Sequence, residues 1–74
     1  MNKVIGSLCQ RLRVNLGYSQ NDVALDTGYS SENVSAFECG RNNNAIILWW
    51  YVMHGLDYDF VMNDINKGET GYGI

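Results

Sequence analysis

Side chains that could perform catalysis or hold a metal ion are few in these 74 residues, and they do not gather in the sequence. His54 is the single histidine, and its place at the end of an apolar stretch favours an interaction with a helix C-terminus over general-base catalysis. Cys9 and Cys39 lie far apart, with neither a CxxC spacing nor a histidine beside them. The carboxylates are scattered, and the chain has no glycine-rich phosphate loop or nucleophile motif. We therefore expect a protein that is not an enzyme and that needs no metal ion or other cofactor.

The charge of the chain restricts how it can bind nucleic acid. Eight Asp and Glu outweigh five Lys and Arg, which gives a net charge of −3 and an isoelectric point near 4.7. DNA-binding domains usually carry a basic face and often have an isoelectric point above about 9. If this protein binds DNA, it does so with little electrostatic help, because its cations do not cluster: Lys3, Arg11, Arg13, Arg41 and Lys67.

Residues 20–40 are the segment whose local pattern is most informative. They predict two short helices, at 20–27 and 31–39, joined by a tight turn at 28–30. Ser19 and Ser30 stand where N-cap hydroxyls accept from free helix amides, and Asp22 completes a capping-box-like arrangement with Ser19. Gly28 supplies the left-handed conformation that ends a helix sharply. This spacing is typical of a helix-turn-helix unit.

Three further helices are expected, at 3–16, 45–54 and 58–63, so that the chain forms an all-α domain over residues 1–65 followed by a flexible tail at 66–74. Cys9 shares an apolar stripe with Ile5, Leu12 and Leu16, which predicts a buried, reduced thiol. No leader segment is recognisable, and no apolar run approaches the roughly 20 residues that span a bilayer. We therefore expect the protein to be cytoplasmic.

The chain resembles the helix-turn-helix family of phage repressors and Cro proteins, called the XRE family, over residues 5–61. The resemblance implies a compact five-helix, lambda-repressor-like domain in a bacterial cytoplasm that docks its third helix in the DNA major groove, usually as a dimer. It is specific through the order and spacing of its anchors: Ile5-Gly6, Leu12-Arg13, Gly17-Tyr18-Ser19-Gln20, Val23-Ala24, Gly28-Tyr29-Ser30, Val34-Ser35, Glu38-Cys39-Gly40 and Gly55-Leu56-Asp57.

The same resemblance implies which residues face DNA. Ala36 can touch only a thymine methyl group, and Glu32 can accept from cytosine but repels phosphate, so the expected reader helix is poor. Glu32 could instead stabilise the positive end of its helix, and the phosphate-facing set could be a solvated loop. The implied base-facing residues are Ser31, Glu32, Ser35 and Ala36, and the implied phosphate-facing residues are Gln20, Arg41, Asn42, Asn43 and Asn44.

Arg13 and Glu38 match a family ion pair that ties the first helix to the third. The alternative is that both side chains are solvated, as charged residues usually are. In either case their role is structural, so Arg13 is not expected to hold a phosphate.

The segment 45–53 is apolar all round, whereas a surface helix shows a polar face. A small core has room for Ile47, Leu48, Tyr51 and one tryptophan. The other apolar side chains of the segment are then a surplus that faces outward. The tail could cover this surplus, or it could form an interface with a second copy or with another protein. The expected interface residues are Leu25, Ile46, Trp49 and Met53.

Two functions from different classes follow. The first is a small dimeric transcriptional regulator of a phage or prophage genetic switch that binds operator DNA. The second is an antirepressor or modulator on the same fold, which captures a repressor protein and binds DNA weakly or not at all. The anchors favour the first function, whereas the acidic charge, the weak reader helix and the apolar segment 45–53 favour the second.

Overall fold

The computed structural model describes residues 3–57, 59 and 61–63, in which the chain forms helices joined by turns and short loops. The elements are α1 (Lys3–Leu16), α2 (Gln20–Thr27), α3 (Ser31–Glu38) and α4 (Ala45–Met53). Residues 59 and 61–63 are also helical, where the fifth helix was predicted, and the described residues contain no strand. The predicted all-α fold is confirmed. The predicted flexible tail at 66–74 lies outside the described residues.

The helix ends follow from their capping groups. The Ser19 Oγ accepts from the Asp22 amide at 3.0 Å, and the Asp22 carboxylate accepts from the Ser19 amide at 2.8 Å. The predicted capping box at the start of α2 is therefore confirmed. Gly28 ends α2 with φ of 81°, in the left-handed region, and its amide donates to the Ala24 carbonyl. Helices α3 and α4 each end one residue earlier than predicted, because Cys39 and His54 act as their C-caps.

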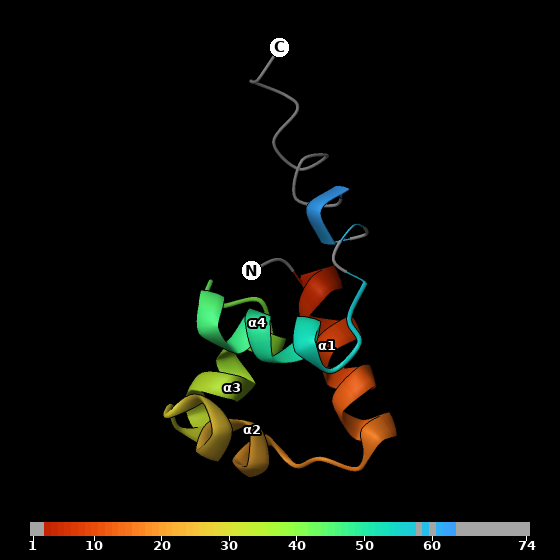
Figure 1. The fold of residues 1–74 in the computed structure, drawn as a ribbon. Coiled ribbons are helices and arrows are strands. Elements are labelled where there is room, and N and C mark those ends of the chain that lie inside the picture. Colours follow the sequence, from red (N-terminus) through yellow and green to blue (C-terminus); the bar gives the residue numbers. More distant parts are fainter. Residues whose placement is uncertain (1–2, 58, 60, 64–74) are drawn as a thin grey trace.

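The helices surround one core. Helix α3 packs against both α1 and α2, and α4 packs against α2 and α1. Figure 1 shows how the helices are arranged. The rings of Phe37 and Tyr51 stack at 6.0 Å between centroids and join α3 to α4. Leu16 was predicted on the apolar stripe of α1, but it is 47% exposed because it is the last residue of that helix. The buried apolar residues are Ile5, Cys9, Val23, Ala24, Val34, Phe37, Ile47, Trp50, Tyr51 and Val61.

Helices α1 and α3 approach each other closely at Gly6. A Cβ atom at this position would lie 2.2 Å from the Glu38 carbonyl oxygen and 3.0 Å from that of Phe37. Only a residue without a side chain permits this backbone contact. The contact holds the inner side of α3 against α1.

In the described part of the chain, no helix is long and apolar enough to cross a membrane.

Candidate nucleic-acid interface

Helix α3 turns one side into the core and leaves the other accessible. Val34, Phe37 and Glu38 are buried. Of the base-facing residues predicted from the resemblance, Glu32 is exposed, whereas three are half-buried: Ser31, Ser35 and Ala36. Because Glu32 and Ala36 are four residues apart, they share one face of the helix. Helix α3 thus presents a short, weakly polar surface in which Glu32 carries the only charge.

Asn33 is an exposed residue of α3 that the sequence-based prediction omitted. Its backbone amide donates to the Ser30 Oγ at 3.2 Å, and its carbonyl accepts from the Asn42 Nδ2 at 3.2 Å. The signal in the sequence was the amide side chain, which is a type that reads purine edges. It was missed because the family pattern assigns base contact to the neighbouring positions.

The predicted phosphate-facing residues fall into two groups. Arg41 and Asn43 are exposed in the loop after α3. Asn42 and Asn44 bind within the loop, since the Asn42 Oδ1 accepts from the Asn44 amide at 3.3 Å and the Asn44 Oδ1 caps α4. Gln20 points inward, where its Nε2 donates to the Glu38 carboxylate at 3.2 Å. The structure therefore leaves Arg41 and Asn43 more available to a ligand than the other three.

Arg13 and Glu38 form an ion pair beneath α3. The Arg13 Nε lies 2.8 Å from the Glu38 Oε2, and the two side chains are 9% and 2% exposed. A second guanidinium nitrogen donates to Oε1 at 3.2 Å, and the Tyr51 hydroxyl donates to Oε2. The remaining Arg13 terminal nitrogen donates to the Tyr18 carbonyl at 2.9 Å. This network joins α1, α3 and α4 and engages each of the three guanidinium nitrogens of Arg13.

The network also shifts the acidity of its neighbours. Burial, and then the charge of Glu38, raise the pKa of the Cys9 thiol to about 12. Burial and the hydrogen bond to Glu38 raise the pKa of Tyr51. The hydrogen bond to Glu38 raises the pKa of Arg13. Cys9 and Tyr51 therefore stay neutral at physiological pH, and Arg13 stays charged.

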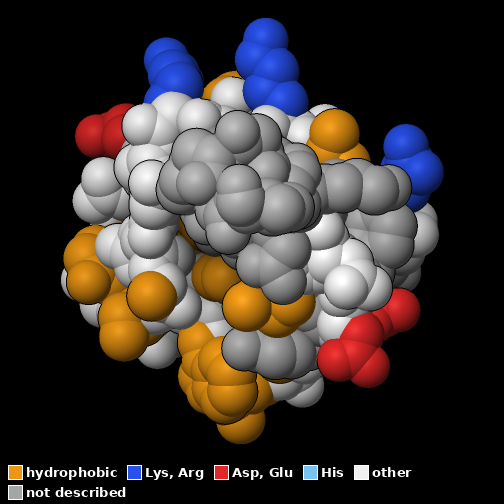
Figure 2. Space-filling view, turned by 90° about the horizontal axis from the view of Figure 1, so that it is seen from above, with side chains coloured by type: hydrophobic (Ala, Val, Ile, Leu, Met, Phe, Trp, Pro, Cys, Tyr) orange, Lys and Arg blue, Asp and Glu red, His pale blue; other side chains and the backbone are white. Residues whose placement is uncertain are grey.

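The exposed cations in the described part of the chain are Lys3, Arg11 and Arg41. Figure 2 shows Lys and Arg side chains along one edge of the visible face, with hydrophobic side chains both beside them and toward the opposite edge. The positive charge amounts to few groups, and exposed Val4 and Val14 share α1 with Lys3 and Arg11.

Helix α4 carries an exposed apolar stripe, formed by Ile46, Trp49 and Met53, which are 54%, 55% and 72% exposed. Their spacing of three and four residues places them on one side of the helix. Leu25 in α2 is 78% exposed. The predicted surplus of apolar side chains thus faces outward.

Trp50, by contrast, is the tryptophan that enters the core. Its indole nitrogen donates to the Asp26 carboxylate at 2.9 Å, and its ring stacks on His54 at 3.7 Å. Tyr18 packs edge-on against both rings. The His54 Nδ1 lies 2.7 Å from the Trp50 carbonyl oxygen, so the His54 side chain contacts the backbone at the C-terminal end of α4.

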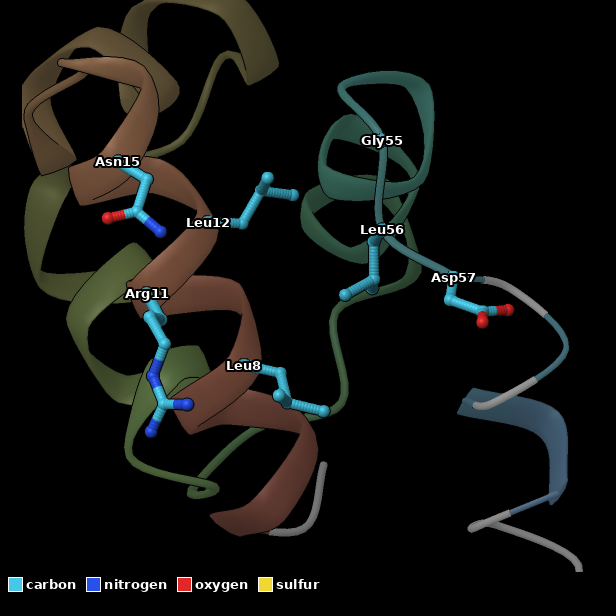
Figure 3. Close-up of a pocket in the computed structure, with 7 residues that line it drawn as sticks. All are labelled: Leu8, Arg11, Leu12, Asn15, Gly55, Leu56 and Asp57. Carbon is cyan, nitrogen blue, oxygen red and sulfur yellow. The ribbon is translucent and has the colours of Figure 1, made fainter.

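A shallow hollow lies between α1 and residues 55–57, and sequence reasoning did not predict it. Figure 3 shows leucine side chains from both walls, with Arg11, Asn15 and Asp57 around them. Its lining is largely apolar: Leu8, Leu12 and Leu56. The described residues contain no group of three or more His, Cys, Asp or Glu that could hold a metal ion.

Comparison with known proteins finds a relative of nearly the same length. The chain is 32% identical over 73 residues to the uncharacterized HTH-type transcriptional regulator y4dJ of Sinorhizobium fredii. The match covers 99% of this chain and 95% of the relative. No family model matches the chain, and no solved structure matches it.

Proposed function

Because the chain belongs to the helix-turn-helix-type transcriptional regulators, we propose that it binds operator DNA as a dimer and acts in a genetic switch of the phage or prophage type. The observation that carries this proposal is the unit α2–turn–α3. Its two helices of eight residues each are capped at both ends, and α3 keeps one side open to a ligand. This is the arrangement that inserts a second, recognition helix into the major groove.

Helix α3 then contacts base edges through Ser31, Glu32, Ser35 and Ala36. The amide end of α2 and the loop after α3 lie beside it, where Gln20, Arg41 and Asn42–Asn44 contact the phosphates. The Arg13–Glu38 pair supports this surface from inside, because both partners are buried beneath α3. The stripe on α4, with Leu25, forms the interface with the second copy, since exposed aromatic and Met side chains are typical of interface centres.

The small number of free cations makes the expected DNA affinity modestly dependent on salt. Arg13 is occupied by Glu38, and Arg11 lies on the side of α1 that lines the hollow, away from α3. Arg41 is the exposed cation directly after α3. Each phosphate that the protein neutralises contributes a slope of roughly −0.9 in log affinity against log salt.

A gel-shift titration over a range of salt concentrations tests the proposal, with DNA that flanks the gene as the probe. We expect a sequence-specific complex whose salt slope becomes shallower by about one unit per monomer contact in Arg41→Ala. Arg11→Ala is the matched control, because it removes the same charge from the far side of α1. The absence of any complex at about 50 mM salt, where attraction is least screened, would contradict DNA binding.

A second function is favoured by the exposed apolar residues of α4 and α2. Trp49, Met53 and Leu25 are each more than half exposed, and few cations accompany them. An antirepressor would use this surface to capture a repressor and would bind DNA weakly or not at all. Adding a purified repressor with its operator to the same titration separates the two functions. An antirepressor strips that repressor from its operator without forming a DNA complex of its own.

A further inference from the structure

We infer that Asn33 reads sequence in addition to the base-facing residues proposed above, and that it recognises adenine in the major groove. The inference rests on the proposed DNA binding and extends it to a position that the family pattern does not supply. It follows from the orientation of α3, from the chemistry of the side chains on its open side, and from the way the backbone of Asn33 is held.

The orientation of α3 leaves the Asn33 side chain exposed. Val34, Phe37 and Glu38 mark the inward side of the helix. Successive residues turn by about 100°, so Glu32 and Ala36 lie opposite that side and Asn33 lies on its flank. Asn33 and Glu32 are exposed, whereas Ser31, Ser35 and Ala36 are half-buried. Asn33 is therefore among the most accessible side chains of α3.

Chemistry separates Asn33 from its neighbours. Glu32 can only accept hydrogen bonds at neutral pH and carries a charge that phosphates repel, and Ala36 has no polar group. The amide of Asn33 carries a donor and an acceptor, and this pair matches the N7 acceptor and N6 donor of adenine. Within the part of the chain that the structure describes, no hydrogen bond engages the Asn33 side chain. The Asn33 side-chain amide, which among these groups best matches a purine edge, is thus free to bind one.

The backbone of Asn33 is braced on both sides. Its amide is held by the cap residue Ser30 at 3.2 Å, and its carbonyl is held by the Asn42 side chain at 3.2 Å. The Asn42 Oδ1 in turn accepts from the Asn44 amide, and the Asn44 Oδ1 caps α4 by accepting from the amides of Ile46 and Ile47. A chain of side-chain bonds therefore connects the start of α4 to the position of Asn33. A reading group held in this way loses less freedom on binding than one on a loosely held loop.

Selection from a randomised duplex library, about two helical turns long, tests the inference. We expect the wild type to enrich a motif that contains one A·T pair in each half-site. The Asn33→Ala variant should lose the preference for this pair and bind the optimal half-site about 5- to 150-fold more weakly. The matched control, Asn15→Ala, removes the same kind of side chain from an exposed position on α1, at the hollow that Arg11 also lines, and should keep the motif. Asn33→Gln carries the same amide and should keep a preference for adenine.

The outcomes separate this inference from the function on which it rests. An enriched motif that Asn33→Ala leaves unchanged overturns the role of Asn33 and leaves DNA binding intact. A wild type that enriches no sequence overturns both. Loss of folding is not expected in Asn33→Ala, because the residue is exposed and alanine is the stronger helix former. An unchanged melting temperature would establish that any lost preference arises at the DNA.

Discussion

Removing either partner of the Arg13–Glu38 pair should cost a large part of the stability of this domain. In Arg13→Ala, the Glu38 carboxylate, which is 2% exposed in the wild type, loses the bonds from the Arg13 Nε at 2.8 Å and from a second nitrogen at 3.2 Å. Stranding a buried charge costs about 3–5 kcal/mol. The donors Tyr51 and Gln20 remain, so we expect a loss near 3 kcal/mol, at the lower end of that range.

The reverse change should cost a similar amount for a different reason. In Glu38→Ala, the Arg13 guanidinium keeps only its bond to the Tyr18 carbonyl, and Tyr51 and Gln20 lose their shared acceptor. A domain of this size has a total stability of about 4–11 kcal/mol, at roughly 0.05–0.15 kcal/mol per residue. Each single variant should therefore retain about 1–8 kcal/mol of that stability. The double variant should lose much less than the sum, because no charge remains stranded.

Urea unfolding followed by tryptophan fluorescence measures this cycle, since Trp50 is 7% exposed and enters water on unfolding. The denaturant slope should be unchanged, which would show that only stability has altered. We expect a coupling energy of about 2 kcal/mol between the two positions. Additivity within about 0.5 kcal/mol would refute the coupling. Tyr51→Phe is a milder test in a folded background, and it should cost about 1.5 kcal/mol through one lost hydrogen bond to a charged group.

Three further predictions concern other parts of the molecule. Gly6→Ala should destabilise by about 1–3 kcal/mol in the same urea assay, because its Cβ would lie 2.2 Å from a backbone oxygen. A gain of up to about 1 kcal/mol, which helix propensity alone would give, would contradict the close approach of α1 and α3. The free energy of unfolding should fall as the pH rises above about 9, by up to about 1.4 kcal/mol per pH unit. The reason is that the Cys9 thiol releases its proton in the unfolded chain, where its pKa is the ordinary 9.0, but keeps it in the folded protein, where its pKa is about 12. Cys9→Ala should flatten this fall between pH 9 and pH 10, and an equal fall in the variant would show that the thiol is not responsible. Sedimentation should show association of wild type that Trp49→Glu abolishes and Val14→Glu preserves, since both residues are more than half exposed but Val14 lies on α1. A strictly monomeric wild type would rule out the dimer through α4.

Local signals in the sequence determined the helices and their ends. Ser19 with Asp22 and the left-handed Gly28 act through bonds to residues a few positions away, so their effect can be read without knowing the fold. The apolar surplus of α4 was also evident, because a domain of this size has too little core to bury such a helix. The charge of the chain, and with it the scarcity of cations for phosphate, depends on composition alone.

The tertiary structure decided how each helix is rotated against its neighbours and which polar side chains form hydrogen bonds between distant segments. Adjacent tryptophans have equal apolar character, and Trp50 rather than Trp49 is buried because Asp26, Tyr18 and His54 surround its ring. Contacts between distant segments likewise turned Gln20 toward Glu38 and tied Asn42 to Asn33. Sequence periodicity shows which residues share a face of a helix, but the rotation of that face is set by packing against neighbouring helices. The exposure of Asn33 likewise depends on how α3 is rotated against α1 and α2.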